Sequence, residues 1–289
     1  MARLRALLRF LPFALLAFVA FPLKARWLRH EFPGLHGIAD YLINHLIELV
    51  ALLAFTVAAA ALERRPFGTY GLPPRLALRT RFWQGALAGI ILLTLLIAGL
   101  AVAGALQLAP PAGPLLPSLG FALGYGIVFL LLGIREEFLY RGYSQVTLAE
   151  AMGFWPAAVI TSAWFTATHL GPSESPIGLA NVALFGLLAC FTLRRTGHLW
   201  LATGFHAAWD WGQTWLYGVG DSGHPPAPGH LLGAIVPAEQ PTWLTGGDVG
   251  PEGSVLAVIV LGLAGLACLA WLRRDPADDG TLALPTSSL

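Results

Sequence analysis

The chain has 289 residues, of which 56% are hydrophobic and only 11% are charged, and its mean hydropathy is +0.67. Because a soluble protein carries about a quarter charged residues, this composition excludes an ordinary soluble domain and indicates a membrane protein. The formal net charge of +1 gives no electrostatic footprint for nucleic acid, so no such partner is expected. Cys190 and Cys268 both lie in apolar runs and are expected to be small core residues, not a disulfide framework.

Eight apolar stretches are long enough, or nearly long enough, to cross a bilayer. In chain order they cover residues 7–23, 41–62, 82–106, 116–146, 155–170, 177–193, 199–217 and 255–272. The first is the weakest, because only fourteen apolar residues separate Arg9 from Lys24 and the Arg-rich start is also typical of a signal peptide. No small-x-small cleavage site follows, so we expect a retained helix. The predicted fold class is all-α, a polytopic transmembrane helical bundle of about eight membrane-spanning helices.

Basic residues gather beside alternate stretches and predict the orientation of the bundle. The clusters are Arg3, Arg5 and Arg9; Arg64, Arg65, Arg75, Arg79 and Arg81; Arg194 and Arg195; and Arg273 and Arg274. With eight spans they share one side, which should be the cytoplasm, and both termini are expected there; residues 24–30 alone run against this pattern. The segment 219–254 has acidic residues but no Lys or Arg, and is expected to be an extracytoplasmic loop. A single lysine against sixteen arginines suggests a GC-rich prokaryotic genome, and hence a bacterial cell membrane.

The segment 135–142 (REEFLYRG) ends an otherwise apolar run with two carboxylates and two guanidinium groups. A charged side chain at membrane depth costs about 2.5–3.5 kcal/mol on insertion scales, so a functional site is the default interpretation. Glu137 and Arg141 are four residues apart and can pair on one helix face. Glu136 lies about 100° around the helix from Glu137, has no partner at helical spacing, and is expected to point into a cavity. Arg135 is expected to reach toward headgroups or Glu150.

Two later stretches carry ionisable residues at the same spacing: Phe165 with His169, and His206 with Asp210. Glu136 lies about sixteen residues before the turn at 152–153 and His169 about sixteen after it, so two antiparallel helices would bring them to one level. A carboxylate beside a neutral imidazole can deprotonate a water molecule, and a second imidazole can stabilise an oxyanion. No Ser or Cys nucleophile motif and no His-Glu-x-x-His motif occurs, so water is the expected nucleophile.

These three motifs, Glu136-Glu137-x-x-x-Arg141, Phe165-x-x-x-His169 and His206-x-x-x-Asp210, resemble those of the CAAX-processing and bacteriocin-processing (CPBP) intramembrane endopeptidases, the type II CAAX prenyl protease or abortive-infection family. The resemblance covers residues 116–211 and makes 115–218 a protease core, between N-terminal transmembrane helices (1–110), the loop 219–254, and a final helix with a polar tail (255–289).

By motif position, the resemblance implies that Glu136 and His169 activate water, that Glu137, Arg141 and Phe165 support the site, and that His206 and residue 210 form the oxyanion pocket. The commoner pattern has Asn at the last position. An ionised Asp210 cannot donate a hydrogen bond to an oxyanion, so Asp210 either stays protonated or orients His206.

Older usage of the family name also implies a metalloprotease. No cofactor is expected, and the alternative is zinc held by Glu136, His169 and His206.

The predicted function is hydrolysis of a peptide bond in a membrane-associated or lipid-modified protein or peptide, within the lipid bilayer. Two other classes stay open: a catalytically silent immunity or scaffold protein, which Asp210 leaves possible, and a transporter or proton relay, which the missing internal repeat disfavours. His45 and Glu48, three residues apart, are expected either to face the cavity or to pair with each other. The sequence leaves open the substrate, its prenylation, its side of entry and the oligomeric state.

Overall fold

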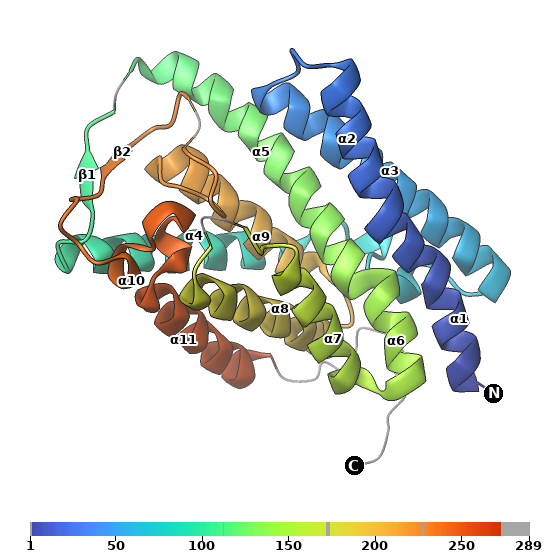
Figure 1. Ribbon diagram of the computed structural model, residues 1–289. Coiled ribbons are helices and arrows are strands. Elements are labelled where there is room, and N and C mark those ends of the chain that lie inside the picture. Colours follow the sequence, from blue (N-terminus) through green and yellow to red (C-terminus); the bar gives the residue numbers. More distant parts are fainter. Residues whose placement is uncertain (1, 112, 172–173, 227, 273–289) are drawn as a thin grey trace.

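The structure is a computed structural model that describes residues 2–111, 113–171, 174–226 and 228–272. Helices dominate it, and they are α1 (Ala2–Leu15), α2 (Phe21–Glu31), α3 (Gly37–Glu63), α4 (Thr80–Val102), α5 (Leu115–Phe138), α6 (Ser144–Met152), α7 (Phe154–Ala167), α8 (Pro176–Thr196), α9 (Trp200–Trp211), α10 (Thr242–Thr245) and α11 (Val255–Trp271). The antiparallel strands β1 (Gln107–Ala109) and β2 (Gly233–Ile235) form a short ribbon at one edge (Figure 1). The all-α polytopic prediction is therefore confirmed.

Five helical segments in the described part of the chain are long and apolar enough to cross a membrane. They are Arg3–Glu31, Gly37–Glu63, Thr80–Val102, Leu115–Met152 and Pro176–Thr196. The first joins α1 and α2 through a π-helical turn, so the weakest of the predicted stretches is part of a continuous helix of 29 residues. The other three predicted stretches are helical but shorter, at α7, α9 and α11.

Helices α4 and α9 make the most extensive helix contact, because two glycines allow their backbones to touch. A Cβ atom placed on Gly85 of α4 would lie 2.0 Å from the carbonyl oxygen of Leu201, and one on Gly204 of α9 would lie 2.0 Å from that of Phe82. Small residues that permit such close approach are a common basis of helix association in membranes. This contact fixes the position of α9, the helix that carries His206 and Asp210.

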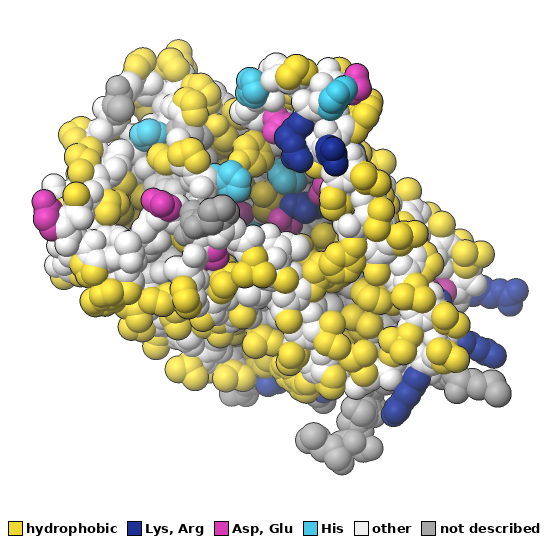
Figure 2. Space-filling view, viewed as in Figure 1, with side chains coloured by type: hydrophobic (Ala, Val, Ile, Leu, Met, Phe, Trp, Pro, Cys, Tyr) yellow, Lys and Arg dark blue, Asp and Glu magenta, His cyan; other side chains and the backbone are white. Residues whose placement is uncertain are grey.

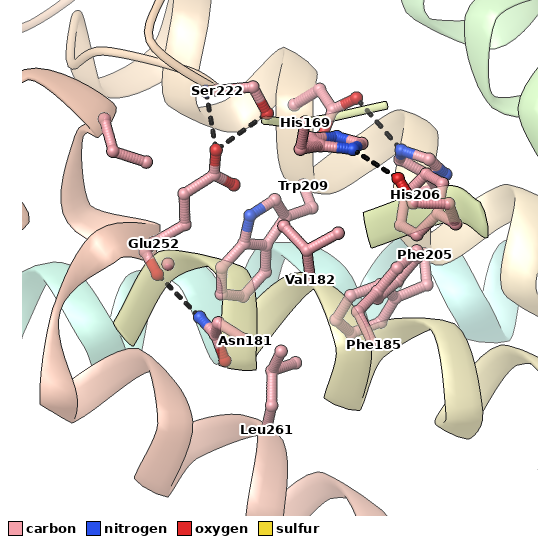
Figure 3. A pocket seen from close by; sticks show the side chains of 14 residues that line it. His169, Asn181, Val182, Phe185, Phe205, His206, Trp209, Ser222, Glu252 and Leu261 are labelled. Atoms are coloured by element: carbon pink, nitrogen blue, oxygen red, sulfur yellow. Dashed lines mark hydrogen bonds and ion pairs between the residues drawn. The ribbon is translucent and has the colours of Figure 1, made fainter. Parts of the chain in front are cut away.

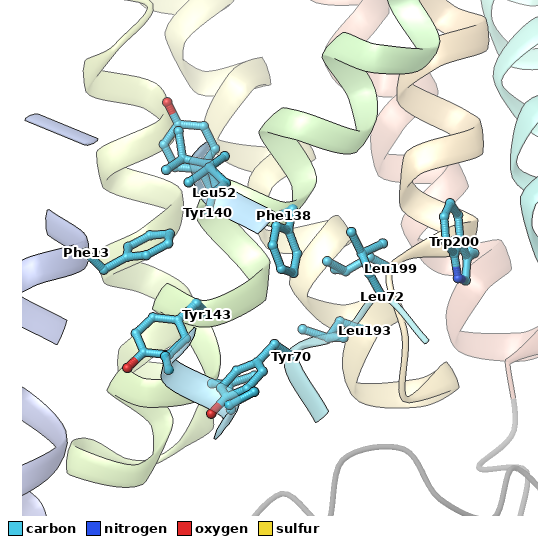
Figure 4. Packing of buried hydrophobic residues seen from close by; sticks show 14 of the residues in the cluster. Phe13, Leu52, Tyr70, Leu72, Phe138, Tyr140, Tyr143, Leu193, Leu199 and Trp200 are labelled. Atoms are coloured by element: carbon cyan, nitrogen blue, oxygen red, sulfur yellow. The ribbon is translucent and has the colours of Figure 1, made fainter. Parts of the chain in front are cut away.

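The main core lies where α1, α3 and the connection between α3 and α4 meet the end of α5, the turn that follows it, and the junction of α8 with α9 (Figure 4). Phe13 of α1 packs against the ring of Tyr143, and Tyr70 packs against Tyr143 from the other side. Both tyrosine hydroxyls donate hydrogen bonds to the carboxylate of Glu63, at 3.0 Å from Tyr70 and 2.9 Å from Tyr143. Arg9 pairs with this carboxylate and also with Glu150 of α6. The N-terminal helix is therefore held by both apolar packing and ion pairs.

Candidate active site

Helix α5 ends in a π-helical turn, Leu139–Tyr143, and the two glutamates lie just before it. The side chain of Glu137 is fully buried, whereas that of Glu136 faces a cavity and keeps 15% of its surface exposed. Adjacent helical residues differ by about 100° in direction, which explains why the two carboxylates have different surroundings. The prediction that Glu136 points into a cavity is consistent with this arrangement.

One oxygen of Glu137 joins the first and third motifs. Its Oε1 atom accepts a hydrogen bond from Nη1 of Arg141 at 3.2 Å and another from Nδ1 of His206 at 2.9 Å. Arg141 is itself fully buried, and its guanidinium carbon lies 4.3 Å from the ring centre of Phe165, over the ring face. Glu137, Arg141 and Phe165 therefore form one buried unit held by an ion pair and a cation–π contact. Oε2 of Glu137 and Nε and Nη2 of Arg141 have no hydrogen-bond partner among the described residues.

His206 lies among three carboxylates. Besides the hydrogen bond to Glu137, its Nε2 atom is 3.6 Å from Oε2 of Glu136 and 3.5 Å from Oδ2 of Asp210. Because Nδ1 faces a carboxylate oxygen, it must carry a proton, and Nε2 is the atom that faces the reactive side. Asp210, one helical turn after His206, is placed to orient the ring.

His169 lies two residues beyond the end of α7, in a turn that follows the helix. Its Nδ1 atom donates a hydrogen bond to the carbonyl oxygen of Phe165 at 2.9 Å, which leaves Nε2 without the proton in the neutral ring. The imidazole packs edge-on against the Phe165 ring, with 4.6 Å between the ring centres. The predicted pair of Phe165 and His169 is therefore present as a contact that fixes the tautomer of the histidine.

Arg135 does not reach toward headgroups or Glu150, as expected from the sequence. It donates to Oε1 of Glu136 at 2.5 Å, and its Nη1 atom lies 3.2 Å from Oε2 of Glu48 on α3. The other oxygen of Glu48 accepts from Nζ of Lys24 on α2 at 2.8 Å. Glu136 thus has a partner after all, and Glu48 pairs with two cations rather than with His45. Sequence spacing could not find the two contacts of Glu48, because they join α3 to α5 and to α2, whereas Arg135 and Glu136 are neighbours in the sequence.

A cavity of about 860 Å³ brings the predicted residues together. Those that line it are Glu136, His169, His206 and Asp210, and Tyr41, His45 and Glu48 of α3 line it as well. Phe18 and Phe21 of the N-terminal helix and Phe129 of α5 supply an apolar wall. In Figure 2, acidic, basic and histidine side chains gather in a hollow that is surrounded by hydrophobic side chains. The cavity therefore combines a polar floor with walls suited to an apolar ligand.

The loop 219–254 covers the site from one side. Gln213, which follows α9, donates from Nε2 to both Asp221 and Glu252, each at 3.2 Å. Glu252 also accepts from the backbone and the hydroxyl of Ser222. Burial, and then the neighbouring Glu252, raise the pKa of Asp221 well above its usual value. From the sequence this loop was predicted only to be acidic and extracytoplasmic. Its position beside Asp210 was not predicted.

The geometry does not favour a metal centre. Among the residues described, no three His, Cys, Asp or Glu side chains converge closely enough to hold a metal ion. His169 and His206 each use Nδ1 in a hydrogen bond, to the Phe165 carbonyl and to Glu137 respectively, so Nε2 is the remaining ring nitrogen of both. Histidines that bind zinc commonly have such a bond at the other nitrogen, so these contacts do not exclude zinc; what disfavours it in this arrangement is only that three protein ligands do not converge among the described residues.

In this helical bundle, buried Glu and His side chains around one cavity supply the groups that a hydrolytic site within a membrane needs. Comparison with family models matches residues 118–212 to the type II CAAX prenyl endopeptidase Rce1-like family. This match to residues 118–212 confirms the predicted resemblance of that segment to the CPBP family. Together with the five long apolar helices in the described residues, it supports an integral membrane protein. Comparison with curated proteins and with solved structures found no match.

Proposed function

We propose that the protein hydrolyses a peptide bond of a membrane-associated or lipid-modified protein or peptide, using water activated by Glu136 and His169. The observation that carries this proposal is the convergence of Glu136, His169, His206 and Asp210 on one cavity with an apolar wall. The apolar wall suits a substrate that enters with a lipid chain or a hydrophobic segment, and the polar floor suits its scissile amide.

In the proposed reaction, the water oxygen attacks the amide carbonyl carbon while one of its protons passes to the Glu136 carboxylate. The unprotonated Nε2 of His169 accepts a hydrogen bond from the second O–H, which stays on the attacking oxygen, and so holds the water in place. When the carbon–nitrogen bond breaks, Glu136 returns the proton to the leaving amine. Arg135 keeps one oxygen of Glu136 engaged, so the other oxygen is the one that takes part.

The oxyanion would be stabilised by His206 in its doubly protonated form. With Nδ1–H donated to Glu137, the ring has a donor on Nε2 only when it is an imidazolium, and Nε2 lies 3.6 Å from Glu136 and 3.5 Å from Asp210. In this proposal Asp210 orients the ring and balances its charge, and does not itself donate to the oxyanion. Preorganised donors of this kind contribute about 10²–10³-fold in rate.

The test is cleavage of an internally quenched, farnesylated CAAX peptide by the full-length protein in liposomes, comparing Glu136→Gln with the wild type. Glu136→Gln keeps the size and hydrogen-bonding shape but removes the base, so we expect a loss of at least about 10³-fold. Glu239→Gln, an exposed carboxylate in the loop, is the matched control and should retain activity. An active Glu136→Gln protein would overturn the proposal.

If neither protein cleaves this peptide, the membrane proteomes of cells carrying each version should be compared for new protein termini. Termini that depend on Glu136 would identify the substrate, and their absence together with an unchanged cellular phenotype would favour the silent scaffold. The proposed reaction is also independent of metal: dialysis against a chelator followed by elemental analysis should leave a metal-free protein with unchanged activity.

A further inference from the structure

A second, much smaller cavity lies behind the two catalytic histidines. It has a volume of about 50 Å³ and lies between α7, α8, α9, α11 and the loop 219–254. His169, His206, Asp210 and Ser222 line both this cavity and the large one. The proposed reaction centre is therefore bordered by two spaces, and only the large one has room for a substrate.

The far end of the small cavity is polar and contains an unsatisfied acceptor. Asn181 of α8 is 3% exposed, and its Nδ2 donates to the carbonyl oxygen of Glu252 at 2.7 Å. Its Oδ1 atom has no hydrogen-bond partner among the described residues. Figure 3 shows Asn181 and Glu252 at one end of the cavity and His169 and His206 at the other. A buried acceptor without a partner destabilises the folded state, because it has lost its hydrogen bonds to water. This oxygen would therefore be stabilised by a ligand that donates a hydrogen bond.

The size of the cavity limits what that ligand is. A water molecule needs about 10–15 Å³ on this measure of volume, so a cavity of about 50 Å³ holds about three or four waters. The polar groups that line it, Asn181, Asp210 and Glu252, are mainly acceptors, which water can satisfy and an alkyl side chain cannot. Phe185, Phe205 and Trp209 form the remaining walls and confine the waters to a path between the two ends.

We propose that this cavity stores the water consumed by the reaction and delivers it to His169 and His206 from the side of the loop 219–254. The inference rests on the proposed hydrolytic function. A substrate with a lipid chain would fill the large cavity and exclude water from it, whereas each bond cleaved uses one water molecule. A separate polar compartment that opens onto the same histidines supplies that water while the substrate is bound.

X-ray hydroxyl-radical footprinting of the full-length, substrate-free protein in lipid nanodiscs tests the presence of this water directly. Radicals form from water at the site, so Trp209, although only 5% exposed, should be oxidised several-fold faster than Trp200, which is 6% exposed but lies in the main core. Equal labelling of the two tryptophans would overturn the proposal.

Asn181→Leu removes the free acceptor at nearly constant volume, and should lower the labelling of Trp209 toward that of Trp200. The matched control is Thr203→Val on α9, outside this cavity. It removes a buried hydroxyl that, like the Asn181 oxygen, has no hydrogen-bond partner among the described residues. Its labelling should equal that of the wild type. If Asn181→Leu leaves the labelling of Trp209 unchanged, Asn181 does not hold the water and the proposal fails.

Kinetics separate a water store from a pocket for a substrate side chain. For a water store, Asn181→Leu lowers kcat about tenfold, leaves KM unchanged, and does not alter the preference among peptides with small or large residues next to the cleaved bond. A change in that preference would instead make the cavity a side-chain subsite and overturn the proposal. Failure of the proposed function would look different. In that case Trp209 would still be labelled as a hydrated residue, but the Glu136→Gln protein would remain active.

Discussion

Nδ1 of His206 lies 2.9 Å from Oε1 of Glu137, and the same oxygen also accepts a hydrogen bond from Arg141. A histidine on α9 is thereby locked to the end of α5, and its protonation pattern is fixed by a residue that does not face the cavity. Because this oxygen serves both Arg141 and His206, we expect Glu137 to affect the free energy of unfolding through Arg141 and peptide cleavage through His206. Substituting Glu137 and Arg141 together can separate the two effects.

Arg141→Met should lower the free energy of unfolding by about 3 kcal/mol, because it removes the guanidinium that pairs with the buried carboxylate of Glu137. The double variant Glu137→Gln/Arg141→Met, which removes both charges, should recover most of this loss. It should remain inactive, because His206 then lacks the carboxylate that accepts from its Nδ1 atom and holds the ring in place. Thermal unfolding in detergent and peptide cleavage check the two parts, and a double variant as unstable as Arg141→Met would contradict the pairing.

Arg135→Gln should lower kcat about 10- to 100-fold with little change in KM, since Arg135 holds Glu136 in place and is not expected to bind the substrate. Arg135→Lys should restore part of the rate, as it keeps the charge but not the forked geometry. Glu48→Gln should produce a weaker loss of the same kind. Steady-state kinetics on the three variants provide the measurement. A change mainly in KM, with kcat unchanged, would contradict the positioning role.

Asp210→Asn should be at least as active as the wild type at neutral and alkaline pH. An amide at this position still orients His206, but it donates a hydrogen bond and does not repel a developing oxyanion. Asp210→Leu, of similar size and unable to form hydrogen bonds, should lose about 10²-fold. The pH dependence of kcat for the three proteins provides the measurement, and an inactive Asn variant would show that the negative charge itself is required.

Gly204→Ala should inactivate the protein without touching the chemistry. The added methyl group would meet the backbone of Phe82 at 2.0 Å, so α4 and α9 must separate, and His206 moves with α9. We expect a clear fall in thermal stability together with loss of cleavage. Gly262→Ala on α11 is the control, because no atom lies within 4 Å of its added Cβ, and it should behave as the wild type.

The sequence predicted the helical architecture and the residues that share the cavity, because spacings of four residues and distance from a turn are local properties of helices. The pair His206 and Asp210 is an example, and so is the common depth of Glu136 and His169. The salt-bridge chain through Arg135, Glu48 and Lys24 was not predictable, since it depends on how α2, α3 and α5 pack. The same holds for Asn181 and Glu252, whose contact joins residues 71 positions apart.

The N-terminal helix forms part of the cavity wall, although its sequence is also typical of a signal peptide. Phe18 and Phe21 close one side of the large cavity, while Arg9 anchors this helix to α3 and α6. Deleting residues 2–22 would remove Phe18 and Phe21 from the cavity wall together with the ion pairs of Arg9. We expect such a deletion to widen the mouth of the cavity and to give lipid acyl chains easier access to its polar floor.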